Sequence, residues 1–135
     1  MVQGEEGLKL SSKWKDEGTR TFLGIHTRGF PNLFLIAGPQ GGGGSFNFTD
    51  AIDEHAEYIV WLLKTMKENG KNRVDVLEEP EAEYTEHCRM ADLSTRPLRD
   101  CVSYYNGHGD AQPGSLAYYG CLLYTSPSPR DYPGS

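Results

Sequence analysis

The sequence predicts an α/β fold in which a buried strand leads through a glycine-dense turn into a long helix. Three observations predict it: a continuous apolar run at 33–37, the glycines that follow it over 38–48, and a helical apolar pattern over 49–69. The order strand, turn, helix is the unit that places ligands at the carboxyl edge of a parallel sheet. The length of 135 residues suits one ordinary domain and is short for two.

The predicted strand is the apolar run Leu-Phe-Leu-Ile-Ala at 33–37. An uninterrupted run of this length fits a strand that is covered on both faces, as strands of parallel sheets are. Pro31 and Asn32 precede it, and Gly38 and Pro39 follow it. All four are residues that favour turns, so they set the expected bounds of the strand.

The predicted helix at 49–69 has the strongest periodicity in the chain. Thr49 is its expected N-cap, and Asn69-Gly70 supplies the C-terminal stop. Its apolar residues recur at steps of four, three, four and three, which places them on one helical face. They are Ile52, Ala56, Ile59, Leu63 and Met66.

The rest of the chain is predicted to hold less regular structure. A weaker helix begins near Pro80, a residue that suits the first turn because no N–H donor is needed there. From Ser94 to Gly120 the sequence is rich in glycine and aromatic residues and is typical of loops. We therefore divide the chain into a unit at 1–70 and a helix and loop-rich segment at 71–120.

The tail at 121–135 differs from everything before it. Its first eleven residues, Cys-Leu-Leu-Tyr-Thr-Ser-Pro-Ser-Pro-Arg-Asp, match in order the translation of a transposase adapter used in short-read sequencing libraries. A plain Ser/Pro-rich tail is the alternative. We interpret 121–135 as an adapter artefact and leave it out of the fold and the function.

Charge and hydropathy exclude several classes of partner. The net charge of −6 argues against nucleic acid or an anionic membrane as the main partner, because both need clustered Lys and Arg. No apolar run approaches the ~18 residues of a membrane helix, and the N-terminus has no secretory signal pattern. We therefore expect a soluble, cytoplasmic protein.

The glycine run leaves two interpretations open. Backbone N–H groups at a strand-to-helix turn bind anions, so the run could contact a nucleotide. However, no Gly-Lys-Ser/Thr follows, and Phe46 stands where a dinucleotide fingerprint starting at Gly41 would need its last glycine. A plain loop remains the alternative. The four histidines lack zinc spacing, so we expect no metal site, and Cys88 and Cys101 are expected to be packing residues.

Residues 29–39, Gly-Phe-Pro-Asn-Leu-Phe-Leu-Ile-Ala-Gly-Pro, resemble the C-terminal part of Baeyer–Villiger monooxygenases, a group of class B flavin-dependent monooxygenases. The resemblance covers residues 7–120 and rests on an ordered set of elements rather than on one decisive motif. The other elements are Trp14, Arg-Thr-Phe-Leu-Gly at 20–24, Asn47, Ile52, His55, Glu57, Ser-Tyr-Tyr-Asn-Gly at 103–107 and Tyr-Tyr-Gly at 118–120.

This resemblance implies a partial Rossmann-like fold from a flavoprotein that binds two dinucleotides, FAD and NADPH. Such enzymes use reduced flavin and O₂ to insert one oxygen atom next to a ketone carbonyl, which gives an ester or a lactone. The chain lacks both glycine fingerprints of the family, its signature motif and its catalytic arginine. The resemblance therefore implies no catalytic residue in this chain, no activity of the chain alone, and the remainder of a parent chain as its partner.

The resemblance also implies the site residues. Phe46 and Phe48 would line an apolar pocket for the ketone, and Tyr104 would approach NADP where the family has tryptophan. The loop departs from the family pattern, because Gln40 and four glycines follow Pro39. The residues implied to contact FAD are Gly38, Pro39, Gln40, Asn47 and Phe48.

Two other functions remain open. An N- or S-hydroxylating flavin monooxygenase would share the flavin, and the upstream signature motif would separate it from a Baeyer–Villiger enzyme. A small non-catalytic binding module that uses the glycine-rich turn is the alternative from another class.

Overall fold

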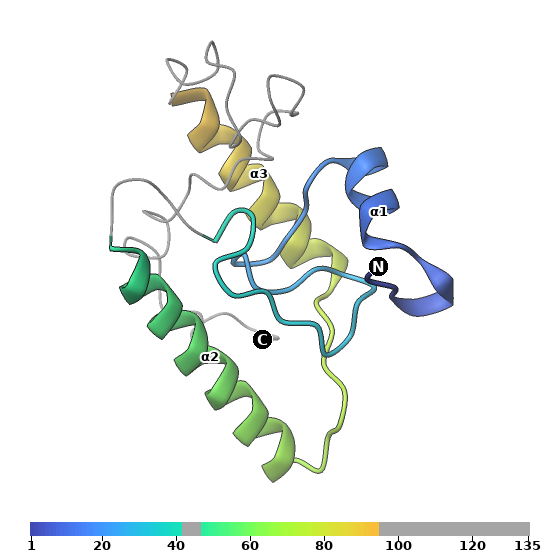
Figure 1. Cartoon of the computed structure of the whole chain (residues 1–135), viewed down its shortest axis with the longest axis vertical. Coiled ribbons are helices and arrows are strands. Elements are labelled where there is room, and N and C mark those ends of the chain that lie inside the picture. The colour runs from blue at the N-terminus through green and yellow to red at the C-terminus, as the bar shows by residue number, and fades with distance from the viewer. Residues whose placement is uncertain (42–46, 95–135) are drawn as a thin grey trace.

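The structure is a computed structural model that describes residues 1–41 and 47–94. A short 3-10 helix, η1 (Glu5–Gly7), precedes α1 (Leu10–Glu17), α2 (Phe48–Glu68) and α3 (Glu78–Ser94). Irregular chain joins α1 to α2, and we call its residues 19–41 the central loop. Figure 1 shows the central loop in the middle of the molecule, with α2 along one side and α1 and α3 on the other.

The strand expected at 33–37 is not formed, and no other strand occurs within the described residues. A strand is held by a row of hydrogen bonds to a neighbour, whereas here Leu35 N–H donates to Ile25 O at 2.8 Å without a ladder around it. Ala37 then takes a left-handed φ of 51°, which ends the extended course. The described part is therefore helical and irregular, and the α/β prediction holds only for its helices.

The helix predicted at 49–69 is confirmed as α2, Phe48–Glu68. Its N-cap is Asn47 rather than Thr49. The side-chain oxygen of Asn47 accepts hydrogen bonds from the backbone N–H of Thr49 at 3.2 Å and from its hydroxyl at 2.7 Å. At the other end Gly70 has a left-handed φ of 63°, as expected for a residue that stops a helix.

The buried face of α2 is displaced by one residue from the predicted face. Leu63, which was expected in the core, is 47% exposed. The apolar residues of α2 therefore cover two neighbouring faces, and the described residues bury only one of them. The buried positions are Ala51, His55, Tyr58 and Leu62, each one residue before a position of the predicted stripe.

The hydrophobic core lies where the central loop meets the two long helices. Phe22, Leu23 and Ile25 of the loop are buried there together with residues of both helices. The helices and the link between them contribute Tyr58, Leu62, Val76, Tyr84 and Cys88.

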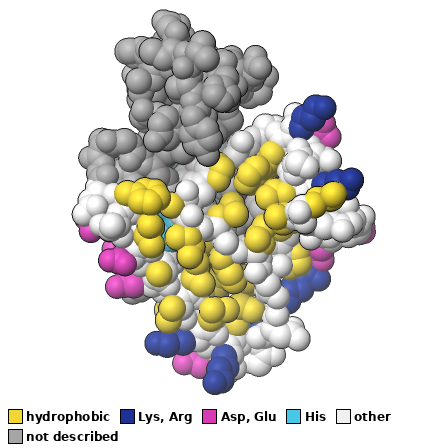
Figure 2. Space-filling model, in the orientation of Figure 1, with side chains coloured by type: hydrophobic (Ala, Val, Ile, Leu, Met, Phe, Trp, Pro, Cys, Tyr) yellow, Lys and Arg dark blue, Asp and Glu magenta, His cyan; other side chains and the backbone are white. Residues whose placement is uncertain are grey.

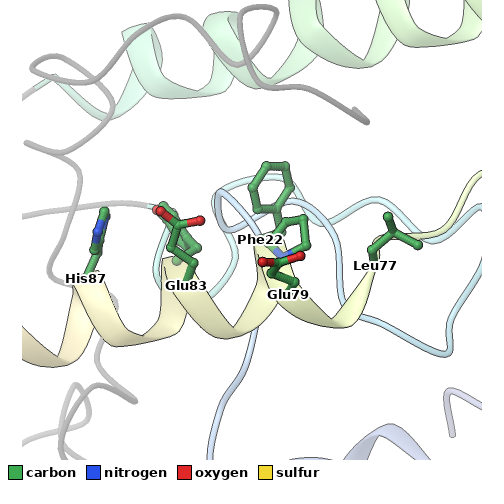
Figure 3. A pocket seen from close by; sticks show the side chains of 7 residues that line it. Phe22, Leu77, Glu79, Glu83 and His87 are labelled. Carbon is green, nitrogen blue, oxygen red and sulfur yellow. The ribbon is translucent and has the colours of Figure 1, made fainter.

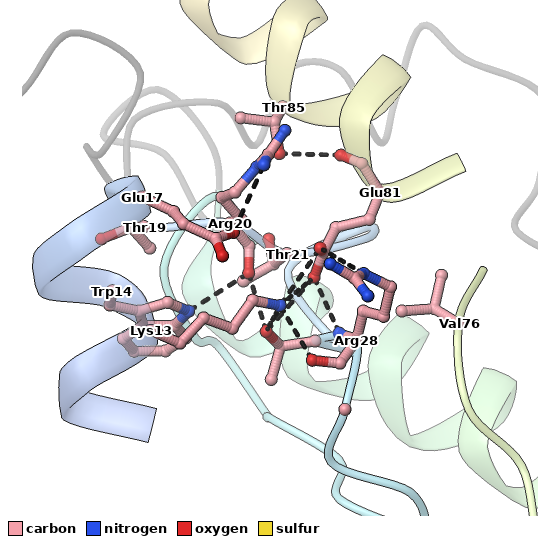
Figure 4. Close-up of polar contacts among 12 residues, drawn as sticks. Lys13, Trp14, Glu17, Thr19, Arg20, Thr21, Arg28, Val76, Glu81 and Thr85 are labelled. Atoms are coloured by element: carbon pink, nitrogen blue, oxygen red, sulfur yellow. Dashed lines mark hydrogen bonds and ion pairs between the residues drawn. The ribbon is translucent and has the colours of Figure 1, made fainter. Parts of the chain in front are cut away.

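A buried ion pair fastens α1 to α3 across the central loop (Figure 4). Lys13 Nζ lies 2.8 Å from Glu81 Oε1, and both side chains are 2% exposed. Lys13 also donates to the hydroxyl of Thr27 at 3.0 Å and to the carbonyl of Arg28 at 2.9 Å. The three N–H groups of the lysine thus have partners, which a buried ammonium requires.

One face of the molecule is apolar in the middle and charged at its edge. Figure 2 shows hydrophobic side chains gathered over the centre of the face seen in Figure 1, with most of the Lys, Arg, Asp and Glu side chains around them. Large hydrophobic side chains with more than half of their area exposed include Ile36, Phe48 and Leu77. An apolar patch with a charged rim marks a surface that another chain segment or partner covers.

Candidate functional site

The turn at residues 37–41, which we call the 37–41 turn, contains the first predicted cofactor contacts. Ala37 and Gln40 have left-handed φ values of 51° and 64°. The N–H of Gly41 donates to the carbonyl of Gly38 at 3.0 Å and closes the turn. Non-glycine residues hold such φ values only where the surroundings fix them, so the contacts around the turn matter for its shape.

The side chain of Gln40 supports the 37–41 turn from inside. Its Oε1 accepts hydrogen bonds from the N–H of Thr21 at 3.1 Å and from the Thr21 hydroxyl at 2.8 Å, and its Nε2 donates to the carbonyl of Thr19 at 3.0 Å. The Tyr84 hydroxyl of α3 donates to the backbone carbonyl of Gln40 at 2.7 Å. The side chain of Gln40 is 0% exposed and therefore faces the interior of the chain.

Gly24 and Gly41 let two segments of the central loop touch backbone to backbone. A Cβ atom on Gly24, whose φ is +68°, would lie 2.1 Å from Gly41 Cα. A Cβ atom on Gly41 would lie 2.9 Å from Cε1 of His55. Both glycines are therefore required by packing within the chain, independently of any ligand.

His55 of α2 lies against the same turn. Its Nδ1 accepts a hydrogen bond from the backbone N–H of Ala37 at 3.1 Å. The residue is 1% exposed, and burial lowers the pKa of its imidazole below the ordinary value. Its Nε2 is buried and has no hydrogen-bond partner among the described residues.

The structure brings only some of the predicted site residues together. Gly38, Pro39 and Gln40 share the 37–41 turn, where the first two are half-buried. Asn47 and Phe48 stand at the start of α2, and the Phe48 side chain is 57% exposed. Phe46 and Tyr104 lie outside the described residues, as does the tail at 121–135.

Sequence reasoning missed the residues that hold the turn. Tyr84 carried no motif, and Thr21 and His55 had no role beyond their places among the elements of the family resemblance. The one available signal is periodicity, because His55 occurs four residues after Ala51 and three before Tyr58 on the buried face. A polar residue on a buried face is expected to have a specific partner.

A cavity of about 320 Å³ lies along α3 (Figure 3). Glu79, Glu83 and His87 rise from one face of that helix beside Phe22 of the central loop. Their spacing of four residues is the only sequence signal for this cavity. No group of three His, Cys, Asp or Glu side chains suited to a metal ion occurs in the described part of the chain.

Two further findings bear on the classes considered above. Burial raises the pKa of the Cys88 thiol to about 12, which keeps it protonated at neutral pH and fits the packing role predicted for it. None of the helices within residues 1–41 and 47–94 has the length and apolar character that crossing a membrane requires.

Comparison with known proteins tests the family resemblance. No family model matches the chain. Pentalenolactone D synthase of Streptomyces exfoliatus is 33% identical over 111 residues, which cover 81% of this chain and 19% of that protein. The Baeyer–Villiger monooxygenase PeniC of Penicillium patulum is 34% identical over 124 residues, covering 87% and 20%. This chain is part of a Baeyer–Villiger monooxygenase-like protein.

The solved structures agree with this assignment. The crystal structure of the OTEMO complex with FAD and NADP matches this Baeyer–Villiger monooxygenase-like chain with a TM-score of 0.72 at 26% identity. The match covers 98% of this chain and 25% of that one. The resemblance predicted from the sequence is confirmed, and the chain spans about a fifth of the length of the curated relatives it matches.

Proposed function

We propose that this chain works as part of a longer FAD- and NADPH-dependent monooxygenase that inserts one oxygen atom of O₂ next to a ketone carbonyl, giving an ester or a lactone. The observation that carries the proposal is the match along more than four fifths of the chain to relatives that include a named Baeyer–Villiger monooxygenase. The fold match to a structure that holds FAD and NADP supports the choice of cofactors.

The described residues fit a flat cofactor at the 37–41 turn. Gly38 and Pro39 are half-buried, so part of their backbone stays open to a ring system, although the side-chain direction of Gly38 itself is filled by Leu35 and Gly24. The buried Nε2 of His55 is a polar atom without a partner in the described part, and it lies beside the same turn. The residues present therefore fit FAD.

In this proposal the chain contributes binding and orientation. The backbone of Gly38 and Pro39 and the start of α2 at Asn47 and Phe48 would hold the flavin part of FAD, which supplies the redox chemistry when bound. The exposed Phe48, together with Phe46, would shape the apolar pocket for the ketone. Tyr104 would contact NADP. The catalytic groups would come from the rest of the longer protein, so the chain alone is inactive and binds no FAD measurably.

The test is to extend the gene in both directions and to purify the protein that contains this chain. We expect a yellow protein that oxidises NADPH in the presence of a ketone, with the ester or lactone identified by mass spectrometry. The 135-residue chain, expressed alone, is the control and should be colourless. NADPH-dependent oxidation of amines or sulfides without ester formation would instead establish the N- or S-hydroxylating alternative.

A further inference from the structure

Neighbouring ring atoms of the His55 imidazole contact different residues of the 37–41 turn. Nδ1 accepts the hydrogen bond from the N–H of Ala37, and the neighbouring Cε1 faces the Cα of Gly41, where a Cβ atom would come within 2.9 Å. Nε2 is the next atom along the ring. The histidine therefore contacts both ends of the turn, and a glycine at position 41 is what allows this contact.

These contacts fix the protonation state of the ring. Because Nδ1 accepts a hydrogen bond, it carries no proton, so the neutral ring has its hydrogen on Nε2. Burial favours the same neutral form. The Nε2–H group is thus a buried donor without an acceptor among the described residues, whereas buried donors in folded proteins are nearly always paired.

The turn depends on support from two helices. From α3, the Tyr84 hydroxyl holds the carbonyl of Gln40, and from α2, His55 holds the N–H of Ala37. Ala37 needs this support because its left-handed φ of 51° is costly for a residue with a Cβ atom. Loss of the histidine would let the segment before Gly38 and Pro39 relax to an ordinary backbone conformation.

We propose that His55 is the positioning residue of the FAD-binding turn. Its Nδ1 holds the peptide of Ala37 in the left-handed form, and its Nε2–H donates to an acceptor atom that the bound cofactor brings. This inference rests on the function proposed above and deepens it. Both ring nitrogens are required, one as an acceptor and one as a donor.

The test uses OTEMO, which has been solved with FAD and NADP, carrying residues 1–120 of this chain in place of its equivalent segment. Apoprotein is titrated with FAD, and binding is followed by quenching of flavin fluorescence and by the visible circular dichroism of the bound flavin. His55→Phe fills the volume but has neither polar atom, and we expect FAD affinity to fall about tenfold or more. His55→Gln supplies both an acceptor and a donor, and we expect affinity within about threefold of the parent chimera.

Two controls separate positioning from a general loss of structure. His87→Phe changes an exposed histidine on α3 and should leave FAD binding unchanged. Ala37→Gly in the His55→Phe background should restore part of the lost affinity, because glycine takes the left-handed conformation without support. Equal binding by the Phe and Gln variants, or no rescue by glycine, would overturn the inference. A parent chimera that folds but binds no FAD would overturn the proposed function itself.

Discussion

The central loop is fastened to α3 and to α2 in opposite electrostatic states. On the α3 side, Glu81 carries a buried charge that Lys13 of α1 balances at 2.8 Å. On the α2 side, His26 Nε2 lies 2.9 Å from the hydroxyl of Tyr58, and burial lowers the pKa of His26 to about 4. The contact between Lys13 and Glu81 needs both groups charged, whereas the contact between His26 and Tyr58 needs the histidine neutral.

This difference indicates how each set of contacts to the central loop can be broken. A charged pair in the interior fails when one partner is removed, because the other charge stays buried. A neutral buried histidine fails when it takes up a proton, because its charged form loses hydration that the interior does not replace. The two sides should therefore respond to different perturbations.

The largest effect is expected on the charged side. Lys13→Met removes the buried cation of Glu81 and leaves only the half-exposed Arg28, whose Nε lies 4.0 Å from Glu81 Oε2, so it should lower the free energy of unfolding by about 3 kcal/mol. Urea unfolding of the 135-residue chain at neutral pH measures this change. The double variant Lys13→Met with Glu81→Leu should lose less than the single variant, because no buried carboxylate remains and Arg28 is exposed enough to be solvated. A single variant as stable as the parent would show that the pair is not buried in solution.

The neutral side should set the lower pH limit of stability. The unfolded chain protonates His26 below about pH 6.5, whereas the folded chain does so only near its pKa of about 4. Stability from this residue is therefore complete above about pH 6.5 and decreases as the pH falls toward 4, by about 3 kcal/mol in all.

The matched variant His26→Gln isolates this contribution. Its free energy of unfolding should be lower than that of the parent at neutral pH and should decrease less between pH 6.5 and 4. Carboxylates titrate in both proteins, so the difference between the two pH profiles belongs to the histidine. Parallel profiles would show that His26 is accessible to protons in the folded chain.

The sequence predicts local features of this fold, such as a helix, better than it predicts which other segments pack against them. The apolar spacing predicted α2 because that spacing is intrinsic to a helix. The predicted buried face, however, differs by one residue from the observed one. The apolar arc of α2 is wide enough that neighbouring segments, not the pattern, decide which part is covered. The run at 33–37 predicted burial correctly in part, since Phe34 packs against the core, but periodicity cannot supply the neighbour that a strand needs.

The candidate site was likewise predictable only where its residues are contiguous in the sequence. The family resemblance located the turn at Gly38 and Pro39 from contiguous residues. It could not indicate that Tyr84 holds the turn, because that contact joins residues 44 positions apart. The partnership of Lys13 with Glu81 spans 68 positions and carries no pattern in either local segment.

The third effect concerns the hydrogen bonds that the Gln40 side chain makes inside the central loop, which involve neither a charged group nor proton uptake. Gln40→Met preserves the volume but leaves the N–H of Thr21 and the carbonyl of Thr19 without their partner. We expect a loss of about 2 kcal/mol in the free energy of unfolding, with little dependence on pH. The same urea titrations at pH 5 and pH 7 measure both. A loss that grows as the pH falls would mean that the Gln40 contacts are coupled to the histidines.

The smallest effect is expected at the exposed counterpart of the buried pair. Arg73 and Glu5 also form an ion pair across 68 positions, but their side chains are 56% and 43% exposed. Water solvates both groups whether or not they meet, so Arg73→Met should cost less than about 1 kcal/mol, and added salt should reduce that cost further. Both pairs join a basic side chain to a glutamate across the same sequence separation, so burial is the main difference that the contrast with Lys13→Met measures. Equal losses would mean that contact between distant segments, rather than removal of the charges from water, makes the buried pair important.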